Sequence, residues 1–308
     1  MIDLGACDVV FLSFDEPNAD THFELVRRAV PRAKQVHGVK GFDAAHRRAG
    51  EIASSPYVIT IDADNVLLDP DFMTARLDIA PRDRARVFSF SGRNTVNGLR
   101  YGNGGVKIWP RSTLLTLQTH ENAARSNAAV DFCWTVPYYQ LNRPLSDVVI
   151  TGSDYQTFRA GFREGVKLNL ADGQIAYDAF PDLPKAEALR AHIGERNLDR
   201  LKVWCTIGAD VGRGDWAIFG ARLGCVMAAL QGFDVAKVAD YGWIEYFWTD
   251  RITPGYSDDQ ARAAYSKELA DQLNDVLDLG IRDLSPEASA YFKSKHRGHR
   301  AYGAMRVV

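Results

Sequence analysis

Short apolar runs alternate with amphipathic stretches along the first part of the chain. The run Tyr57–Ile61 is apolar or β-branched throughout, which predicts a strand buried on both faces of a parallel sheet. Between such runs apolar positions recur at helical spacing, and Thr21 with Glu24 has the spacing of a capping box. The expected strands are 8–14, 33–39 and 57–61, and the expected helices begin near Thr21 and at a cap on Asp43 and end at Pro31 and Pro56. This alternation predicts an open α/β sheet whose ligands lie at the carboxyl ends of the strands.

The rest of the chain is less regular. Two further strands are expected over 87–90 and 106–109, around a glycine-rich turn from Asn97 to Gly105, so the sheet should gain antiparallel strands. Helical spacing returns over 184–201, 216–230 and 258–279. We therefore expect a mixed α/β sheet flanked by helices, followed by a mainly helical C-terminal part.

The composition is that of a globular chain. Its 308 residues, 46% of them hydrophobic, suit about two domains or one large single-sheet domain, and exclude disorder, collagen and coiled coil. The net charge of −2 gives no overall attraction to nucleic acid, so a polyanion site would be a local patch. The cysteines form no CxxC pair and are expected to be reduced, packed thiols. Neither a signal peptide nor a membrane span is evident, so a cytoplasmic protein is expected.

The most informative segment is Ile59–Asn65, in which a buried strand ends in two carboxylates. In an extended chain the period of two places Asp62 and Asp64 on the same side. Two converging carboxylates suit Mg²⁺ or Mn²⁺, which keep coordination sites for water and phosphate oxygens and can neutralise a diphosphate leaving group. The alternative is a pair of polar residues that merely ends a strand.

The stretch from Gly41–Arg48 to Asp62–Asn65 resembles the nucleotide-sugar half of GT-A glycosyltransferases, in which a helix with basic residues precedes a strand that ends in a metal-binding DxD motif. The resemblance implies a GT-A-like, Rossmann-related mixed sheet, a UDP-sugar donor, and Mn²⁺ or Mg²⁺ on Asp62 and Asp64. It also implies that the nucleotide sugar is held by Ser13, Phe14, Asp15, Glu16, Lys40, His46, Asp62, Ala63 and Asp64. For His46 and its neighbour Arg47 the alternative is a solvated helix face.

A second resemblance covers more of the chain. Four segments are similar to a group of virus-encoded glycosyltransferases that place sugars on hydroxymethylated pyrimidines in DNA, namely Phe14–Ala19, Val36–Gly41, Gly102–Lys107 and Phe158–Gly165. This implies transfer of a hexose or pentose from a UDP-sugar to a 5-hydroxymethylpyrimidine in DNA, with 5-hydroxymethylcytosine as the first choice, by a bacteriophage protein in the host cytoplasm. It also implies a GT-A-like nucleotide-sugar and catalytic domain over 1–225 and a helical C-terminal region with a basic tail over 226–308.

Several residues could contact the acceptor or a phosphate. They are Asn103, Gly104, Gly105, Lys107, Trp109, Arg159 and Arg163. The glycines can bring backbone N–H groups close to an anion, and the lysine and tryptophan that follow are at a period of two, which would place a cation and an aromatic plane on one face. The two arginines are four residues apart on an expected helix. The alternatives are a plain hairpin turn, a strand with one buried face, and arginines paired with acids such as Glu164.

An inverting transfer also needs a carboxylate as general base. Asp131 lies between apolar neighbours, where burial would raise its pKa towards a useful value, and Asp154 and Glu164 are its rivals. A structural hydrogen-bond acceptor is the alternative for each. A histidine ligand of the metal is left unassigned among His120, His192, His296 and His299. The basic tail could hold DNA phosphates or be a solvated terminus, and it contains Lys293, Lys295, His296, Arg297, His299, Arg300 and Arg306.

Other functions stay open. The acceptor could be a cell-surface glycan. The motif could belong to a haloacid-dehalogenase-like phosphatase, although that class places Asp-x-Asp on its first strand. A noncatalytic nucleotide-binding module is a further alternative. The sequence does not decide the sugar, the stereochemical course, the pyrimidine or the oligomeric state, and no protein partner is inferred.

Overall fold

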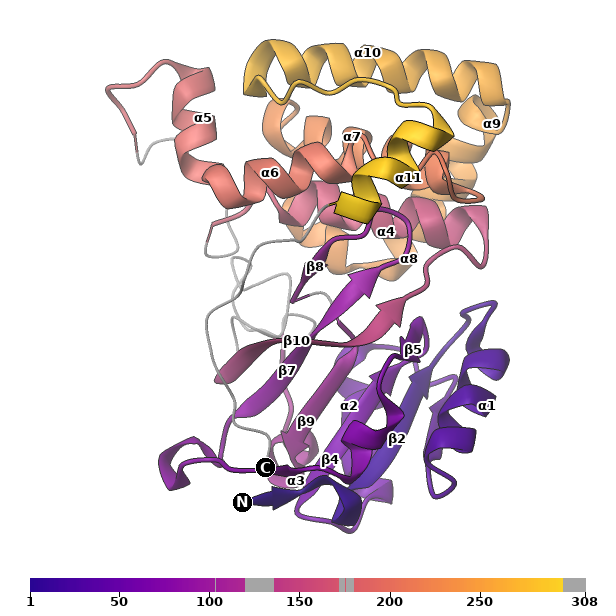
Figure 1. Ribbon diagram of the computed structural model, residues 1–308. Coiled ribbons are helices and arrows are strands. Elements are labelled where there is room, and N and C mark those ends of the chain that lie inside the picture. The colour runs from indigo at the N-terminus through magenta and orange to yellow at the C-terminus, as the bar shows by residue number, and fades with distance from the viewer. Residues whose placement is uncertain (103, 120–135, 172–174, 176–179, 296–308) are drawn as a thin grey trace. The chain divides into compact units, whose positions relative to one another are not determined.

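A computed structural model describes residues 1–102, 104–119, 136–171, 175 and 180–295 (Figure 1). The chain divides into two compact units. The described residues up to 119 together with 136–152 belong to the first unit, and the described residues from 153 to 295 belong to the second. The domain boundary expected between residues 225 and 226 lies inside a helix of the second unit, α7 (Gly214–Leu230).

The first unit is built around a mixed sheet with the strand order β3-β2-β4-β9-β7-β10-β5, and β8 pairs with β7. The strands are β2 (Asp8–Ser13), β3 (Lys34–His37), β4 (Tyr57–Asp62), β5 (Asn65–Leu67), β7 (Val87–Asn94), β8 (Arg100–Tyr101), β9 (Val106–Pro110) and β10 (Tyr138–Val148). A separate short pair joins β1 (Ile2–Asp3) and β6 (Arg76–Leu77). The helices are α1 (Ala19–Ala29), α2 (Phe42–Ile52) and α3 (Arg111–Leu115), with 3-10 turns at η1 (Leu4–Ala6), η2 (Pro70–Thr74) and η3 (Pro81–Asp83).

The strand directions bring most strand ends to one edge of this sheet. Strands β3, β2 and β4 run parallel, β9 is antiparallel to both β4 and β7, and β7 runs parallel to β10. The carboxyl ends of β2, β3, β4, β7 and β10 therefore share an edge with the amino end of β9. Ligands of open α/β sheets bind at such a carboxyl edge.

Helices α1 and α2 cover opposite faces of the parallel half. The chain steps from β2 outwards to β3 and then back to β4, and right-handed crossovers in opposite directions place their helices on opposite sides. On the α1 side, Val26 packs in one core cluster with Phe11 and Ile61. Because side chains of a strand alternate, Thr60 and Asp62 face the α2 side.

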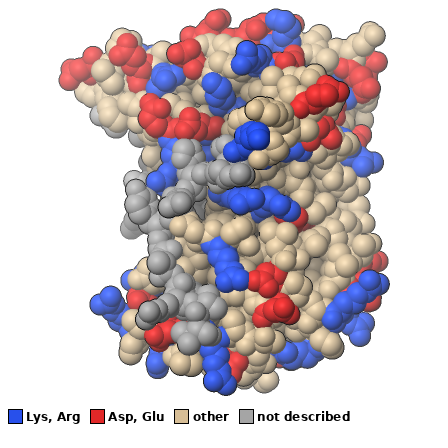
Figure 2. Space-filling view, in the orientation of Figure 1, with Lys and Arg blue, Asp and Glu red and all other residues tan. Residues whose placement is uncertain are grey.

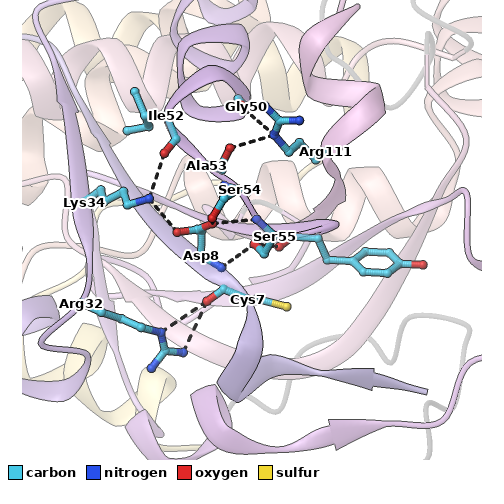
Figure 3. A network of polar contacts seen from close by, with 11 residues as sticks. Cys7, Asp8, Arg32, Lys34, Gly50, Ile52, Ala53, Ser54, Ser55 and Arg111 are labelled. Carbon is cyan, nitrogen blue, oxygen red and sulfur yellow. Dashed lines mark hydrogen bonds and ion pairs between the residues drawn. The ribbon is translucent and has the colours of Figure 1, made fainter.

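Asp8 ties together the opposite, amino ends of the strands (Figure 3). Its carboxylate accepts hydrogen bonds from the backbone N–H groups of Ser54 and Ser55, at 2.7 and 2.9 Å. Lys34 Nζ donates to the same carboxylate and to the carbonyl of Ile52, both at 2.8 Å. Burial opposes the charged carboxylate, but Lys34 and the serine donors outweigh burial and hold the pKa of Asp8 below its usual value. The network joins β2, β3 and the segment before β4, away from the carboxyl edge.

The second unit is helical. Besides α7 it contains α4 (Asp154–Lys167), α5 (Lys185–Ile193), α6 (Glu195–Trp204), α8 (Tyr241–Phe247), α9 (Thr253–Tyr256), α10 (Asp259–Leu277) and α11 (Pro286–Lys295), the 3-10 turn η7 (Val235–Ala239) and the π-helical segment η8 (Trp248–Ile252). Helices α4 and α7 approach to backbone contact through glycines on both. A Cβ atom on Gly161 would lie 2.9 Å from the carbonyl carbon of Ala217, and one on Gly224 would lie 3.1 Å from that of Phe162. Among the described residues, no helix combines the length and apolar composition that a membrane crossing needs.

The expected mixed α/β fold is confirmed: antiparallel strands extend a parallel half, and helices make up the second part. Some local expectations were wrong. Helix α1 begins before Thr21, so the expected capping box does not start it. Asp43 does not cap α2, because the helix already begins at Phe42, and its buried carboxylate accepts hydrogen bonds from the N–H and hydroxyl of Thr119. The helix expected over 184–201 is two helices, since Gly194 breaks it with a φ of 76°. Strand β10 was not expected.

Candidate active site

The turn after β4 carries the two aspartates of the candidate metal site. Strand β4 ends at Asp62, Ala63 and Asp64 form a turn, and β5 begins at Asn65. Strand β9 begins beside it, and the backbone N–H of Asp62 donates to the carbonyl of Gly105 at 3.2 Å. The alternation of side chains expected for a strand therefore ends at Asp62, where β4 ends. The carboxylate of Asp64 is oriented by a separate hydrogen bond instead.

The Asp62 carboxylate faces a buried lysine of the neighbouring strand. Lys107 Nζ lies 3.4 Å from Asp62 Oδ2 and donates to the carbonyl of Gly104 at 3.3 Å. The Lys107 side chain is 6% exposed, whereas that of Asp62 is 35% exposed. A buried ammonium group needs compensating acceptors. Asp62 supplies one of them and still keeps exposed surface for a ligand.

Asn65 sets the carboxylate of Asp64. Asn65 Nδ2 donates to Asp64 Oδ1 at 2.5 Å. Asn65 Oδ1 accepts from Ser146 Oγ at 2.5 Å and from the backbone N–H of Gly105 at 3.0 Å. Asn65 is 1% exposed, so this amide is locked inside the sheet. The turn is thereby coupled to β10 and to the segment that leads into β9.

Helix α1 holds the peptide between the two aspartates. His22, 6% exposed, places Nδ1 2.7 Å from the carbonyl oxygen of Ala63. Because a carbonyl oxygen can only accept, Nδ1 carries the proton in this contact. Asn18 Nδ2 lies 3.5 Å from His22 Nε2 and donates to the carbonyl of Val149 at 3.1 Å. Helical spacing alone did not reveal this role of His22.

His46 lies on α2, packed against the sheet. It is 2% exposed and stacks on Phe42 with ring centroids 3.9 Å apart. His46 Nδ1 lies 2.9 Å from the carbonyl oxygen of Phe42, and Nε2 has no hydrogen-bond partner among the described residues. Burial lowers the pKa of His46 to about 4, although the charge of Asp62 opposes this shift. His46 is therefore neutral at pH 7 and does not lie on a solvated helix face.

Trp109 is fully buried, in agreement with the alternative of a strand that has one buried face. Its Nε1 donates to Thr60 Oγ1 at 2.9 Å, and its ring meets His46 edge-on at 5.1 Å. Lys107 and Trp109 do share one face of β9. Both are buried because β9 lies inside the sheet, between β4 and β7, with α2 against this face.

The ends of β2 and β3 place a second polar group on the same edge. Ser13 Oγ accepts from Gln35 Nε2 at 3.0 Å and lies 3.0 Å from His37 Nδ1. The expected nucleotide contacts that follow are exposed or half-buried, namely Phe14, Asp15, Glu16 and Lys40. His37 and Gln35 were not predicted, since a short alternating strand gives no sign of which polar side chains meet across strands.

The donors at this edge fit a hard divalent cation. Mg²⁺ and Mn²⁺ prefer oxygen ligands and are commonly held by one or two carboxylates together with water and substrate phosphates. Asp62 offers a partly exposed carboxylate, and Asn65 orients that of Asp64. Within the described part of the chain, no group of three or more His, Cys, Asp or Glu side chains gathers as a metal site.

The other predicted acids belong to the second unit and have partners there. Asp154 is exposed and lies 2.8 Å from Arg213 in an ion pair. Glu164 pairs with Lys167 at 3.6 Å. Asp154 is thus a hydrogen-bond acceptor for Arg213, which is the alternative given above for this acid.

The two predicted arginines of α4 flank a tyrosine. The guanidinium carbons of Arg159 and Arg163 lie 5.1 and 4.7 Å from the ring centroid of Tyr241. Arg163 Nη1 also donates to the carbonyl of Val238 at 2.9 Å. These contacts join α4 to α8 and to the η7 turn before it.

Several predicted residues lie outside the described residues, namely Asn103, His120, Asp131, His296, Arg297, His299, Arg300 and Arg306. Of the tail, Lys293 lies in α11 and forms an ion pair with Asp210 at 2.5 Å. His192 lies in α5.

The likeness of this chain to known proteins is distant. No family model matches it, and no curated protein sequence matches it. Among solved structures, it is similar to the mannosyltransferase PcManGT from Pyrobaculum calidifontis in complex with GDP-Man and Mn²⁺. The two share 13% identity over 87% of this chain and 86% of the other, with a TM-score of 0.34.

Proposed function

We propose that this chain is a metal-dependent glycosyltransferase that takes its sugar from a nucleotide-sugar donor. The proposal is carried by Asp62 and Asp64, two carboxylates held at the carboxyl edge of a parallel strand by partners from other strands. Bound Mn²⁺ or Mg²⁺ would neutralise the diphosphate of the donor as it leaves. A nucleoside diphosphate sugar is therefore the substrate class that this donor set suits.

Each residue around the edge has a distinct proposed role. Asp62 and Asp64 bind the cation. Asn65 keeps the Asp64 carboxylate in one orientation, and His22 holds the peptide between the aspartates. Ser13 and the residues after it bind the nucleoside, because they end a neighbouring parallel strand of the same edge. Preorganised partners of this kind keep the ligands in place before the donor arrives.

For the donor nucleotide we propose UDP, and for the acceptor a 5-hydroxymethylpyrimidine in DNA, first of all 5-hydroxymethylcytosine. Both rest on the resemblance of the sequence segments given above. The face in Figure 2 carries both acidic and basic side chains. Because the net charge of the chain is −2, DNA would be held by a local cluster, and the basic tail is the densest one in the sequence. The acceptor base would be flipped out of the duplex if its hydroxymethyl group cannot be reached in the groove.

The general base is proposed to be Asp131, with Asp154 and Glu164 as rivals. Its task is to take the proton of the acceptor hydroxyl while that oxygen attacks the sugar carbon, if the configuration inverts. Replacement by asparagine removes the base and retains the shape, so the true base should be the position where turnover falls and donor affinity does not.

A haloacid-dehalogenase-like phosphatase is less favoured. That class places its Asp-x-Asp on the first strand of the sheet, whereas here β2 ends in Ser13 and the motif ends β4. Release of inorganic phosphate from simple phosphate esters, with no transfer of sugar, would favour it.

The test follows the sugar. The protein is incubated with Mn²⁺, a panel of UDP- and GDP-sugars, and DNA that contains 5-hydroxymethylcytosine, 5-hydroxymethyluracil or neither. The DNA is then digested to nucleosides and weighed. A mass increase of one sugar on a hydroxymethylated nucleoside supports the proposal in full. Release of the nucleoside diphosphate without any change in the DNA would support a transferase and refute the DNA acceptor, and a glycan would then be tried.

Asparagine variants connect the activity to the site. Asp62→Asn and Asp64→Asn should each lower turnover by about 100-fold or more, because each removes a charge from the cation site. Asp78→Asn is the matched control, since Asp78 is exposed and lies on the short segment after β6. Full turnover by either site variant, or by EDTA-treated protein, would contradict the proposal.

A further inference from the structure

The ammonium group of Lys107 places a positive charge beside the candidate metal site. The Lys107 side chain is 6% exposed, and its Nζ lies 3.4 Å from Asp62 Oδ2. Antiparallel pairing of β9 with β4 places Lys107 opposite Thr60, so its side chain shares the sheet face on which Asp62 lies. The contact with the carbonyl of Gly104 adds a second acceptor. The ammonium group is therefore built into the edge of the sheet and is not a mobile surface charge.

This position has a consequence for any divalent cation. An ammonium group and a metal ion that approach the same carboxylate repel each other, and the repulsion is stronger where little water intervenes. Asp62 already compensates one positive charge, so it offers less net negative charge to a metal than its formal charge suggests. A diphosphate reverses this balance, because its own negative charges attract both the metal and the ammonium group.

We propose that Lys107 is the built-in counter-ion of Asp62 and lowers the affinity of the nucleotide-free site for a divalent metal ion. The metal ion is then bound tightly only together with a nucleoside diphosphate. This inference rests on the proposed function. It predicts an order of events in which metal and nucleotide enter as one complex. Lys107 is therefore a positioning residue, whose charge offsets that of Asp62 until a diphosphate binds.

The experiment measures Mn²⁺ binding directly. Free Mn²⁺ is followed by its electron paramagnetic resonance signal at pH 7.5, with protein alone and with protein plus UDP or GDP, each compared with the nucleotide alone. Lys107→Met and Lys107→Gln remove the charge. Without nucleotide, the Mn²⁺ affinity of both variants should be at least about tenfold higher than that of the wild type. A tenfold change corresponds to the smallest pKa shift, about one unit, that a neighbouring cation causes in a carboxylate. The advantage should shrink when UDP or GDP is present.

Lys34→Met is the matched control. Lys34 also pairs with an aspartate of this sheet, Asp8, at 2.8 Å, but at the amino ends of the strands (Figure 3). Its Mn²⁺ affinity should equal that of the wild type. Circular dichroism establishes that each variant is folded.

The outcomes separate this inference from the proposed function. If Asp62→Asn abolishes Mn²⁺ binding while both Lys107 variants bind no more tightly than the wild type, the inference is wrong and the metal site stands. If Asp62→Asn and Asp64→Asn leave Mn²⁺ binding with nucleotide unchanged, the metal site itself is wrong, and the inference falls with it. Wild-type protein that binds Mn²⁺ equally tightly with and without UDP or GDP would overturn the inference even if neither Lys107 variant folds.

Discussion

The close approach of α4 and α7 gives the sharpest prediction about stability. Gly161 of α4 lies against the backbone of α7, where an added Cβ atom would be 2.9 Å from the carbonyl carbon and 3.0 Å from the Cα atom of Ala217, and closer still to the carbonyl oxygen. Gly165 meets Ala221 one turn further on in the same way. Gly161→Ala should therefore destabilise the protein, although alanine is the better helix former.

The size of the effect follows from two opposing contributions. Alanine in place of a helical glycine gains about 1 kcal/mol from helix propensity. Overpacking a dense interior costs about 1–3 kcal/mol. The obstacle here is backbone, which cannot rotate away as the end of a side chain can, so the upper part of that range applies. The expected net loss is about 2 kcal/mol, or a fall of roughly 4–8 °C in Tm for a domain of this size.

The assay is thermal and urea denaturation followed by circular dichroism. Gly255→Ala is the control, because Gly255 lies in the helix α9 and an added Cβ atom there would meet nothing within 4 Å. Its Tm should be unchanged or slightly higher. The double variant with Gly165→Ala should lose less than the sum of the single losses, because helices already separated by one methyl group have room for the second. A Gly161→Ala protein that melts at or above the wild-type temperature would refute the reasoning.

Two further predictions concern charge and thiols. Asp8→Asn should lower Tm at pH 7. Because the folded pKa of Asp8 lies below its unfolded value of about 3.9, the stabilisation is present above that pH and lost as the pH falls. The wild-type Tm should therefore drop more than the variant Tm between pH 5 and pH 3, and parallel curves of Tm against pH would contradict this. Burial raises the pKa of Cys7 to about 11 and that of Cys225 to about 12, and raises that of Cys205 as well. At pH 8 these three thiols should react with a thiol reagent only after denaturation, and peptide mapping that finds them labelled in the folded protein would show that they are not packed.

The parallel half of the fold could be predicted because the local sequence of each strand and helix contains the signals that define it. The strands at 8–13 and 57–62 contain unbroken runs of apolar or β-branched residues over 9–12 and 57–61, and turn residues, glycine or proline separate the strands from the helices. Strand β10 gave no such signal. It contains Pro144 and several polar residues, and its register with β7 shifts around Pro144. Its strand conformation depends on pairing with β7 and β5, which are distant in sequence. Tertiary pairing of this kind leaves no periodic pattern to read.

The candidate site shows the same division. Asp62 and Asp64 could be predicted, because a strand that ends in two acids is visible in the sequence. Their partners could not, since Lys107 and His22 come from elements 45 and 41 residues away from their contacts at Asp62 and Ala63. The burial of Trp109 could not be predicted without the order of the strands in the sheet. The spacing of Trp109 from Lys107 was right, yet the strand proved to be internal, and both side chains are buried.

The glycines near the motif explain how the lysine reaches the aspartate. A Cβ atom on Gly105 would lie 2.6 Å from Asp62 Cβ, and one on Gly104 would lie 2.6 Å from the backbone nitrogen of Gly92. Side chains at these positions would push the start of β9 away from β4 and β7. The hydrogen bond from the Gly105 N–H to Asn65 and the 3.4 Å contact between Lys107 and Asp62 both need that close approach. The sequence suggested these glycines as an anion cradle or a hairpin turn, and in the structure they allow the start of β9 to pack closely against Asp62 and Asn65 on one side and against β7 on the other.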